Sequence, residues 1–364
     1  NHYTAARRLR SDDAYTPGGT AGFRPDNATI VYTRILKRLF PAIPVVIGGI
    51  EASMRRLMHY DYWKDRLEPS ILISSGADML IYGMAERAVA ALVKRVKGGE
   101  RLKEITDLPQ SAYLWPGGNS LPSLPGVTDK ALRPCKEAMA SRKAYAENFV
   151  LFEKTSNSMK PVRLTEQCGD TMVVVNPPLS PATEAEADAI YELPFNYAPH
   201  PRYDRKGAIP AWEMIRFSVN IHRGCFGGCR FCAIAAHQGK FVSSRSEGSI
   251  LREIEKISRM EGFKGYLTDL GGPSANMYRM AGRDTGRCMK CGRPSCIWPS
   301  VCDNLNTSHR ELTALYRRVN SLPYVKKAFV SSGVRYDLLM KEYNRAAGKD
   351  EKEYLEELIV GHTS

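Results

Sequence analysis

Long apolar runs are missing from this sequence. A helix that spans a bilayer needs roughly 20 consecutive apolar residues, whereas the best candidate here, residues 43–50, has only the length of a strand. A basic segment followed by an apolar core and a cleavage site is also missing, so nothing points to secretion. Internal repeats and low-complexity tracts are absent from the sequence as well. We therefore expect a cytoplasmic globular protein.

Cysteines are few before residue 225, and their distribution excludes a disulfide scaffold. The total of 9 is odd, and such scaffolds belong to smaller secreted chains. Cys135 and Cys168 stand alone, and we interpret them as ordinary structural residues. The other seven fall into two tight groups between residues 225 and 302. Clustered thiols in a cytoplasmic protein indicate metal binding.

Composition and charge are those of a soluble protein with a basic surface. The 364 residues suggest two domains, and the hydrophobic share of 43% suffices for a sizeable core. Against 39 acidic residues stand 52 basic ones, a net charge of +13. This excess is compatible with nucleic acid, with a phosphorylated or carboxylated ligand, or with a solvated basic surface. The chain begins at Asn1, and we expect that a natural N-terminal segment precedes it.

Residues 1–100 are predicted to form an incomplete Rossmann-like N-terminal domain. A helix is expected at 26–39 with Asp26 as its cap, strands at 44–47 and 78–82, and a second helix at 85–96. Strand, glycine turn and helix in succession predict part of a doubly wound parallel sheet. Its ligand crevice lies where Gly48, Gly49 and Glu51 follow the first strand. The alternative is that these glycines only permit tight turns.

Residues 101–210 are predicted to be an irregular connecting or insert region. Proline and glycine are concentrated at 108–134, which is expected to be loop. A charged helix at 136–154 and a strand at 171–175 are expected, followed by a linker-like break at 176–181.

Residues 211–364 are predicted to form a partial (β/α) barrel. Strands are expected at 214–221, 263–270, 327–330 and 357–360, and helices at 247–260 and 308–319. The chain ends before a barrel of six or eight units could close, so we expect an open or truncated barrel.

The first cysteine group has the spacing C-x3-C-x2-C directly after a predicted strand. Three thiolates, from Cys225, Cys229 and Cys232, can serve three irons of a cubane iron–sulfur cluster and leave the fourth open. Gly224, Gly227 and Gly228 allow the backbone to fold closely around such a cluster. The alternative is zinc with His222 or His237 as fourth ligand, although structural zinc sites usually combine two separated ligand pairs.

This loop resembles that of the radical S-adenosylmethionine (SAM) superfamily, in which an aromatic residue such as Phe231 precedes the last cysteine. The longer segment 222–234, HRGCFGGCRFCAI, resembles the YgiQ-type radical SAM protein family. Further segments that carry this resemblance are 10–19 (RSDDAYTPGG), 59–63 (HYDYW), 193–195 (LPF) and 243–246 (SSRS). The resemblance covers nearly the whole chain.

The resemblance implies how SAM is bound. The open iron would hold its amino and carboxylate groups, and Phe231 would place its backbone near the adenine. Gly271, Gly272 and Pro273 match the glycine-glycine motif that accepts the amino group, with proline where many relatives have glutamate. Ser331, Ser332 and Arg335 follow the third strand and either face the ribose or carboxylate, or cap the strand and form an ion pair. Asp269 is either a polar pocket group or a helix cap.

The resemblance also implies the reaction. An external electron donor reduces the cluster, SAM is cleaved reductively, and a 5′-deoxyadenosyl radical abstracts hydrogen from an unknown substrate. One alternative is an RNA-modifying radical SAM enzyme, which the basic charge would suit. An alternative of another class is a non-catalytic iron–sulfur or zinc-stabilised binding module, against which the open iron and the glycine-glycine motif argue.

The second group, within the loop 286–303, consists of Cys288, Cys291, Cys296 and Cys302. Four thiols within fifteen residues predict a second metal centre. An auxiliary [4Fe–4S] cluster, a zinc and a set of unmetallated thiols are the three alternatives, of which we favour the cluster. We expect this loop on the same face of the barrel as the first cluster.

The N-terminal part resembles the later portion of the cobalamin-binding-type domain that precedes some radical SAM barrels. Residues 45–49 (VVIGG) and 78–86 carry this likeness. The histidine-bearing cobalamin motif is not present in the sequence, so bound cobalamin is not predicted.

Overall fold

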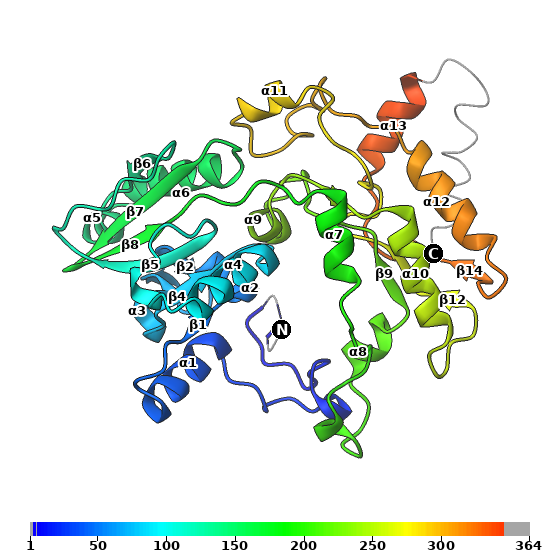
Figure 1. Ribbon diagram of the computed structural model, residues 1–364, viewed down its shortest axis with the longest axis horizontal. Coiled ribbons are helices and arrows are strands. Elements are labelled where there is room, and N and C mark those ends of the chain that lie inside the picture. Colours follow the sequence, from blue (N-terminus) through cyan, green and yellow to red (C-terminus); the bar gives the residue numbers. More distant parts are fainter. Residues whose placement is uncertain (1–2, 5, 346–364) are drawn as a thin grey trace.

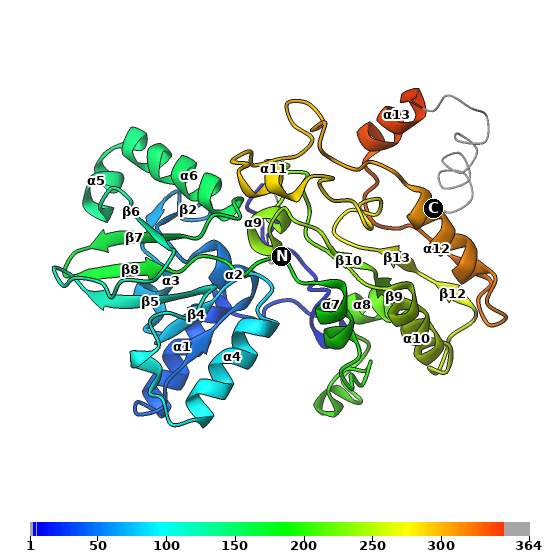
Figure 2. The same ribbon diagram turned by 45° about the horizontal axis from the view of Figure 1, so that its top comes forward.

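A computed structural model describes residues 3–4 and 6–345. Figures 1 and 2 show two lobes, with a mixed sheet and its helices in the first and short strands with long helices in the second. The fold is thus mixed α/β, as the alternation of elements predicts. In the described part of the chain no helix combines the length and apolar character needed to cross a membrane.

The elements predicted for the first hundred residues are confirmed. They are helix α1 (Ala28–Leu39), strands β1 (Val46–Ile47) and β4 (Met79–Ile81), and helix α4 (Glu86–Lys97). Asn27 occupies the cap position of α1, so Asp26 is not the cap, and its carboxylate accepts a hydrogen bond from the Tyr3 hydroxyl instead, at 2.7 Å. Shorter elements lie beside them: η1 (Pro17–Gly19), α2 (Gly49–Met54), β2 (His59–Asp61), β3 (Arg66–Glu68), α3 (Ile71–Ser75) and η2 (Leu102–Glu104).

The stretch expected to be irregular instead completes the N-terminal sheet. It contributes strands β5 (Ser111–Pro116), β6 (Thr128–Ala131), β7 (Val162–Cys168) and β8 (Thr171–Val175). The order is β1-β4-β5-β8-β7-β6, in which β1–β4 and β6–β7 are parallel and the other pairs are antiparallel. The sheet is therefore mixed and not a doubly wound parallel sheet. Ser141 divides the helix expected at 136–154 into α5 (Cys135–Ala140) and α6 (Arg142–Ser156).

Alternation along β4 places apolar side chains on both faces of this sheet. Leu80 belongs to a buried cluster with residues of α2, α3 and four other strands. Met79 and Ile81 belong to a second cluster with Ala88 and Leu92 of α4. Both faces are thus covered by helices, which explains why the strand is apolar throughout.

Cys135 and Cys168, expected to stand alone, are joined in a disulfide with a Cα–Cα distance of 5.0 Å. Cys135 begins α5 and Cys168 ends β7, so the two are 33 residues apart in sequence. Both sulfurs and a carboxylate oxygen of the buried Glu166 lie within 4.8 Å of one another.

The second lobe has the strand order expected of a partial (β/α) barrel. Strand β9 (Ser218–Asn220) pairs in parallel with β13 (Asp269–Gly271), and β12 (Tyr266–Leu267) pairs in parallel with β14 (Lys327–Ala328). Only Thr268 separates β12 from β13, so the second expected strand lies between the first and the third. The expected helices are confirmed as α10 (Glu247–Ser258) and α12 (Arg310–Asn320). The strand predicted at 357–360 lies outside the described residues.

The first expected strand is shorter than predicted, because residues 214–215 belong to helix α8 (Pro210–Ile215). Other elements of this part are α7 (Glu184–Tyr191), η3 (Pro201–Tyr203), β10 (His222–Arg223), α9 (Ile234–Gln238), β11 (Ser243–Ser244), α11 (Thr285–Met289) and α13 (Tyr336–Arg345).

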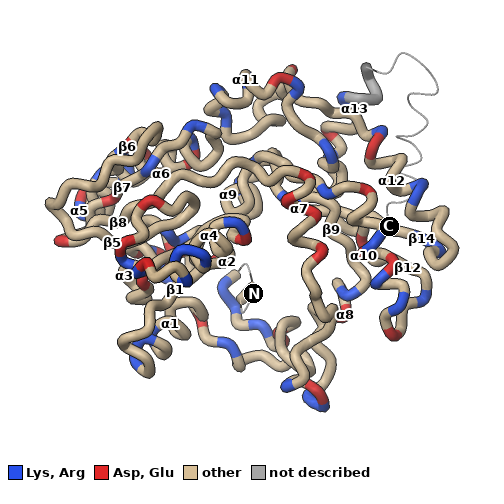
Figure 3. Tube along the Cα trace, viewed as in Figure 1, with Lys and Arg blue, Asp and Glu red and all other residues tan. Residues whose placement is uncertain are grey.

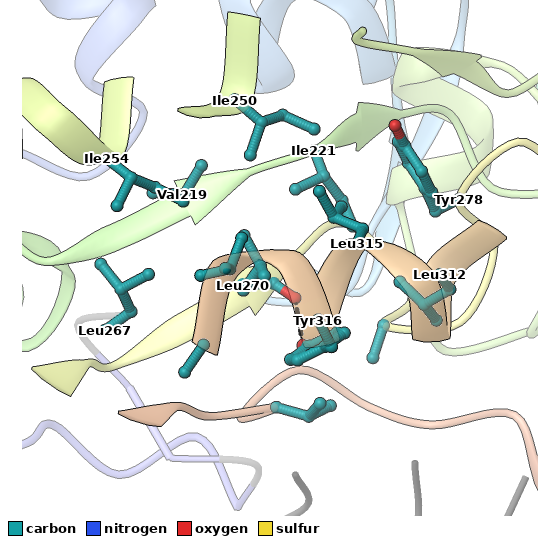
Figure 4. Packing of buried hydrophobic residues seen from close by; sticks show 14 of the residues in the cluster. Val219, Ile221, Ile250, Ile254, Leu267, Leu270, Tyr278, Leu312, Leu315 and Tyr316 are labelled. Atoms are coloured by element: carbon teal, nitrogen blue, oxygen red, sulfur yellow. Dashed lines mark hydrogen bonds between the residues drawn. The ribbon is translucent and has the colours of Figure 1, made fainter. Parts of the chain in front are cut away.

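The core of the second lobe packs α10 and α12 against the short strands (Figure 4). Ile250 and Ile254 of α10 meet Val219 of β9 in this cluster, and Leu315 of α12 is also fully enclosed. The Tyr316 hydroxyl donates a hydrogen bond to the Leu270 carbonyl, as Figure 4 shows. This bond ties α12 to the strand that ends in Gly271.

Candidate functional site: two cysteine loops at the end of the strands

The first cysteine loop leaves and returns through a small antiparallel pair. His222 of β10 pairs with Ser244 of β11, so residues 224–242 form the excursion between them. Gly224 has a φ of +86°, and a Cβ there would overlap the Phe241 carbonyl. Only glycine fits such a position.

The loop brings the thiols of Cys225, Cys229 and Cys232 together. A Cβ built on Gly227 would lie 3.3 Å from the Cys225 sulfur and 3.6 Å from the Cys229 sulfur. Burial raises the pKa of the Cys225 thiol, and the neighbouring Cys232 and Cys229 raise it further. The three thiols that are closely spaced in the sequence therefore also lie together in space.

Arg335 reaches this group from the turn after β14. Its guanidinium lies 3.2 Å from the Cys229 sulfur and also pairs with Asp337 at 2.6 Å. The ion pair that the sequence left as an alternative for Arg335 is thus present, and it holds the guanidinium against the loop. Phe231 is 92% exposed, so its ring is free of packing.

The glycine-glycine motif follows β13 and lies against the cysteine loop. A Cβ on Gly272 would stand 2.5 Å from Cε1 of His222, so the imidazole contacts the glycine backbone directly. His222 is fully buried, and burial lowers its pKa to about 3. Neither ring nitrogen of His222 has a hydrogen-bond partner within the part of the chain that the structure describes. The neutral ring therefore fixes the position of the Gly272 backbone, which Pro273 follows.

Asp269 is neither a free pocket group nor a helix cap. Its carboxylate accepts hydrogen bonds from the backbone N–H of Ser331, at 3.0 Å, and of Ser332, at 3.3 Å, and from the Ser332 hydroxyl. A Cβ on Gly271 would stand 3.0 Å from this carboxylate. Asp269 thus joins the end of the second strand to the turn after the third, as the strand-end capping alternative for the two serines implies.

The second cysteine loop packs directly on the first. The Ser295 hydroxyl donates to the carbonyls of Phe226, at 3.0 Å, and Gly227, at 2.9 Å, and the Cys296 N–H donates to Phe226 at 3.1 Å. Phe226 is the centre of a buried cluster that both loops share, together with Met277, Met280, Ile297, Leu305 and Leu338. These contacts show that the two loops pack against each other; their common face of a barrel stays a prediction.

Polar partners also surround the second group of thiols. Asn304 Nδ2 lies 3.3 Å from the Cys288 sulfur, and the ammonium of the buried Lys240 lies 3.7 Å from the Cys291 sulfur. Burial raises the pKa of Cys296 to about 11, and the charge of Lys240 opposes that rise. Lys240 belongs to the first cysteine loop, so the sequence around the second group of thiols does not indicate this contact.

No three sulfurs of this second loop, all of whose residues the structure describes, lie within 4.8 Å of one another. A single zinc, with Zn–S bonds of about 2.3 Å, holds its sulfurs within about 4 Å of one another. Among residues 3–4 and 6–345, only Cys135, Glu166 and Cys168 place three ligand atoms within 4.8 Å. Neither cysteine loop, with or without His222 or His237, has the compact geometry of a mononuclear site.

At the predicted crevice, the structure shows contacts within the protein for Gly48, Gly49 and Glu51. A Cβ on Gly48 would lie 3.1 Å from the Ile81 carbonyl, and Gly49 has a φ of +80°. The Glu51 carboxylate accepts hydrogen bonds from the N–H and hydroxyl of Thr29, at 3.1 and 2.8 Å. These contacts support the tight-turn alternative.

Comparisons with known proteins place the chain in a family. The family described as "Radical SAM N-terminal" matches residues 1–218. A UPF0313 protein of Porphyromonas gingivalis is 52% identical over the whole chain, which covers 57% of that protein, and one of Bacteroides thetaiotaomicron is 50% identical, with 60% covered. The chain thus spans less than two thirds of the length of these curated relatives.

A solved structure also matches in part. It is the radical S-adenosylmethionine methyltransferase TsrM from Kitasatospora setae, with tryptophan substrate and a SAM analogue bound. The match covers 71% of this chain and 35% of that one, at 13% identity and a TM-score of 0.35. At this score the two chains differ in most of their detail.

Proposed function

The chain belongs to the UPF0313, or YgiQ-type, family of the radical SAM superfamily, and we propose that it is a radical SAM enzyme. A [4Fe–4S] cluster at the first loop would supply the electron that cleaves SAM reductively. Cys225, Cys229 and Cys232 would hold it. The observation that carries the proposal is the proximity of these three thiols: the Cys225 and Cys229 sulfurs flank Gly227, and Cys232 lies close enough to raise the pKa of Cys225.

The donor set fits such a cluster. Each thiolate of a cubane binds a different iron, so the sulfurs need to surround a shared space and not to touch. Gly227 faces two of the three sulfurs without filling that space. Arg335, 3.2 Å from the Cys229 sulfur, places a positive charge beside the negative charge that the bound thiolates would carry.

The residues around the loop would bind SAM. Gly271, Gly272 and Pro273 offer backbone carbonyls for its amino group, and His222 fixes their position. Ser332 and Arg335 would face the ribose or the carboxylate, with Ser332 held in place by Asp269. The backbone of Phe231 would contact the adenine.

For the second loop we propose an auxiliary iron–sulfur cluster held by Cys288, Cys291, Cys296 and Cys302. The wide sulfur spacing favours a cluster over a single zinc. The contact between Ser295 and Phe226 supports a position next to the first centre, where the cluster would bind substrate or carry electrons. Lys240 would offset the negative charge of its thiolates.

RNA is a weaker substrate candidate than a small molecule or a protein. Figure 3 shows lysine and arginine spread over both lobes, intermixed with acidic residues. Sequence-independent RNA binding would use a continuous basic surface and weaken steeply with salt, because bound phosphates release counterions. A filter-binding titration at low and high salt tests this, and tight salt-sensitive binding would reinstate RNA.

Reconstitution tests the central proposal. The protein, loaded anaerobically with iron and sulfide and given a strong reductant and an electron-transfer partner, should convert SAM to 5′-deoxyadenosine and methionine. Alanine at Cys225, Cys229 or Cys232 should abolish the products, whereas Cys135→Ala should keep them. Undiminished cleavage in any of the three loop variants would contradict the proposal.

Metal analysis tests the second centre. The triple variant that lacks Cys225, Cys229 and Cys232 should keep about four irons per chain. One zinc in their place would show a structural metal site, and four titratable thiols in the folded protein without metal would show that the loop binds none.

A further inference from the structure

A cavity with a volume of about 240 Å3 lies between the lobes, apart from the thiols. The first lobe contributes Arg56, Tyr82 and Gln110, and the second contributes Arg223, His237 and Ser243. Its wall is connected to the first cysteine loop, because the Cys225 N–H donates to the Gly239 carbonyl at 3.1 Å. A molecule bound in the cavity would therefore touch the segment that carries the thiols.

Arg56 is a buried cation at this cavity without a carboxylate partner. Its side chain is 2% exposed. One terminal nitrogen donates to the Ser53 carbonyl and the other to the Ser156 hydroxyl, at 3.1 Å. The guanidinium also lies over the rings of Tyr82 and Phe152, 4.4 Å from each centroid. Its Nε has no partner in the described part of the chain. Burial lowers its pKa to about 10, so it remains charged at neutral pH.

The other two buried arginines each have a paired carboxylate, which Arg56 lacks. Arg163 pairs with Asp129 at 2.7 Å, and Arg245 pairs with Glu253. Both are 1% exposed, as enclosed as Arg56. Since a buried charge is costly unless it is paired, the two arginines away from the cavity carry their own counterion. Within residues 3–4 and 6–345 Arg56 forms no ion pair; the charge of Glu153 acts on it without direct contact, and its side chain lines the cavity.

Two more unpartnered polar atoms line the same cavity from the second lobe. They are Nδ1 of His237 and the hydroxyl of Ser243, which is 5% exposed. Buried polar groups are almost always hydrogen-bonded, so three such atoms around one space point to a polar occupant. Ser243 belongs to the SSRS segment, whose role the cysteine chemistry does not explain.

The remaining charges leave the cavity electropositive. Glu86 is the acidic residue of its wall, and it is already paired with Arg223. Arg87 is paired with Glu186, which lies outside the wall, at 3.2 Å. The Lys160 ammonium adds a further positive charge at the exposed rim.

We propose that this cavity binds a small molecule through a phosphate group, held by Arg56, Ser243 and His237. A guanidinium fork matches the geometry of phosphate oxygens. Phosphate, with several terminal oxygens, can accept from both lobes at once, whereas a planar carboxylate offers only two. This inference goes beyond SAM cleavage and does not depend on it.

Calorimetric titration with inorganic phosphate tests the proposal. Ionic strength is held constant with sodium chloride so that screening does not change, and acetate is titrated in parallel. We expect saturable phosphate binding and at least about tenfold weaker acetate binding. Arg56→Met should weaken phosphate binding by at least about tenfold, since a hydrogen-bonded charge is lost. Ser243→Ala should weaken it by about fivefold.

Arg163→Met is the matched control, because it removes an equally buried arginine that does not line the cavity. It should leave phosphate affinity unchanged. If Arg56→Met does not fold, Ser243→Ala and His237→Gln decide the test. Acetate binding as tight as phosphate, no phosphate binding at millimolar concentration, or unchanged affinity in Ser243→Ala and His237→Gln would each overturn the proposal. Because no SAM is present, failure here is distinct from failure of SAM cleavage.

Discussion

Single buried groups set the geometry of the cysteine site. His222 is neutral and enclosed, and its ring occupies the space that any side chain on residue 272 would need. The glycine is thus required by a contact with a residue 50 positions earlier in the chain. The backbone proposed to bind SAM is therefore also a packing surface for His222.

Replacing this glycine tests that contact. Gly272→Ala should destabilise the protein by about 1–3 kcal/mol, because the new methyl forces the imidazole out of its position. It should also weaken SAM binding, since the Gly271–Pro273 backbone shifts. Gly333→Ala is the control: nothing lies within 4 Å of its Cβ position, so denaturant midpoints should stay near wild type. Equal midpoints for both variants would contradict the packing role.

Glu166 makes stability depend on pH. Burial raises its pKa to about 7 from 4.5, although the Met58 N–H donates to it at 2.8 Å. The folded state therefore holds a proton that the unfolded chain releases above pH 4.5. Stability should fall as pH rises from about 4.5 to about 7 and then level off.

Glu166→Gln should remove this decline. The difference in unfolding free energy between variant and wild type should shift by about 3 kcal/mol in favour of the variant across that pH range. Urea unfolding at several pH values, with the Cys135–Cys168 disulfide intact, measures the shift. Parallel pH curves for the two proteins would show that Glu166 ionises freely.

At the scale of elements, the second lobe depends on α12 holding the central strand. The Tyr316 hydroxyl donates to the Leu270 carbonyl, one residue before Gly271, so helix packing and site position are coupled. Apolar contacts of Leu312, Leu315 and Val319 hold the rest of the helix in place.

Tyr316→Phe should therefore cost about 1–3 kcal/mol, because the buried carbonyl of Leu270 loses a donor. Tyr266→Phe is the matched control, since Tyr266 is 45% exposed and packs on Phe329 through its ring alone. Thermal unfolding of both variants measures the cost. If Tyr266→Phe lowered the unfolding free energy as much as Tyr316→Phe, the loss would not come from the hydrogen bond to Leu270.

At the scale of the whole molecule, an ion pair connects the sheet lobe with the second lobe. Arg223, next to the cysteine loop, pairs with Glu86 at the start of α4, and both side chains are partly exposed. Helices α2 and α9 are also in contact across the junction. The cavity lies at the same junction, so its occupant would add contacts between the lobes.

A double-mutant cycle with Arg223→Met and Glu86→Gln should give a coupling free energy of about 0.5–1 kcal/mol, because partly exposed pairs are screened by water. The coupling should shrink as salt is raised. A salt-independent coupling of several kcal/mol would mean that this pair is desolvated and dominates the junction.

The local pattern of apolar and turn residues was sufficient to predict the elements with long periodic runs. Helices α1, α4, α10 and α12 and strand β8 lie where periodicity and turn residues predicted them. Strands β5, β6 and β7 were not predicted as such, because proline and glycine around them resemble loop and their partners are distant in sequence. Sheet pairing is a long-range property, and so the mixed order of the N-terminal sheet could not be deduced.

The residue pattern was sufficient to predict that Cys225, Cys229 and Cys232 lie together, because three thiols in an eight-residue, glycine-containing loop after a strand cannot be far apart once that loop turns back. It also determined the glycine-rich loop around them, since close backbone approach demands glycine. Only the tertiary structure decided which distant side chains meet these loops: His222 against Gly272, Arg335 against Cys229, Lys240 against Cys291. Arg56 and Ser243 likewise reach one cavity from different lobes. The packing of segments that are distant in sequence, and not local spacing, decides which buried arginine has no paired carboxylate.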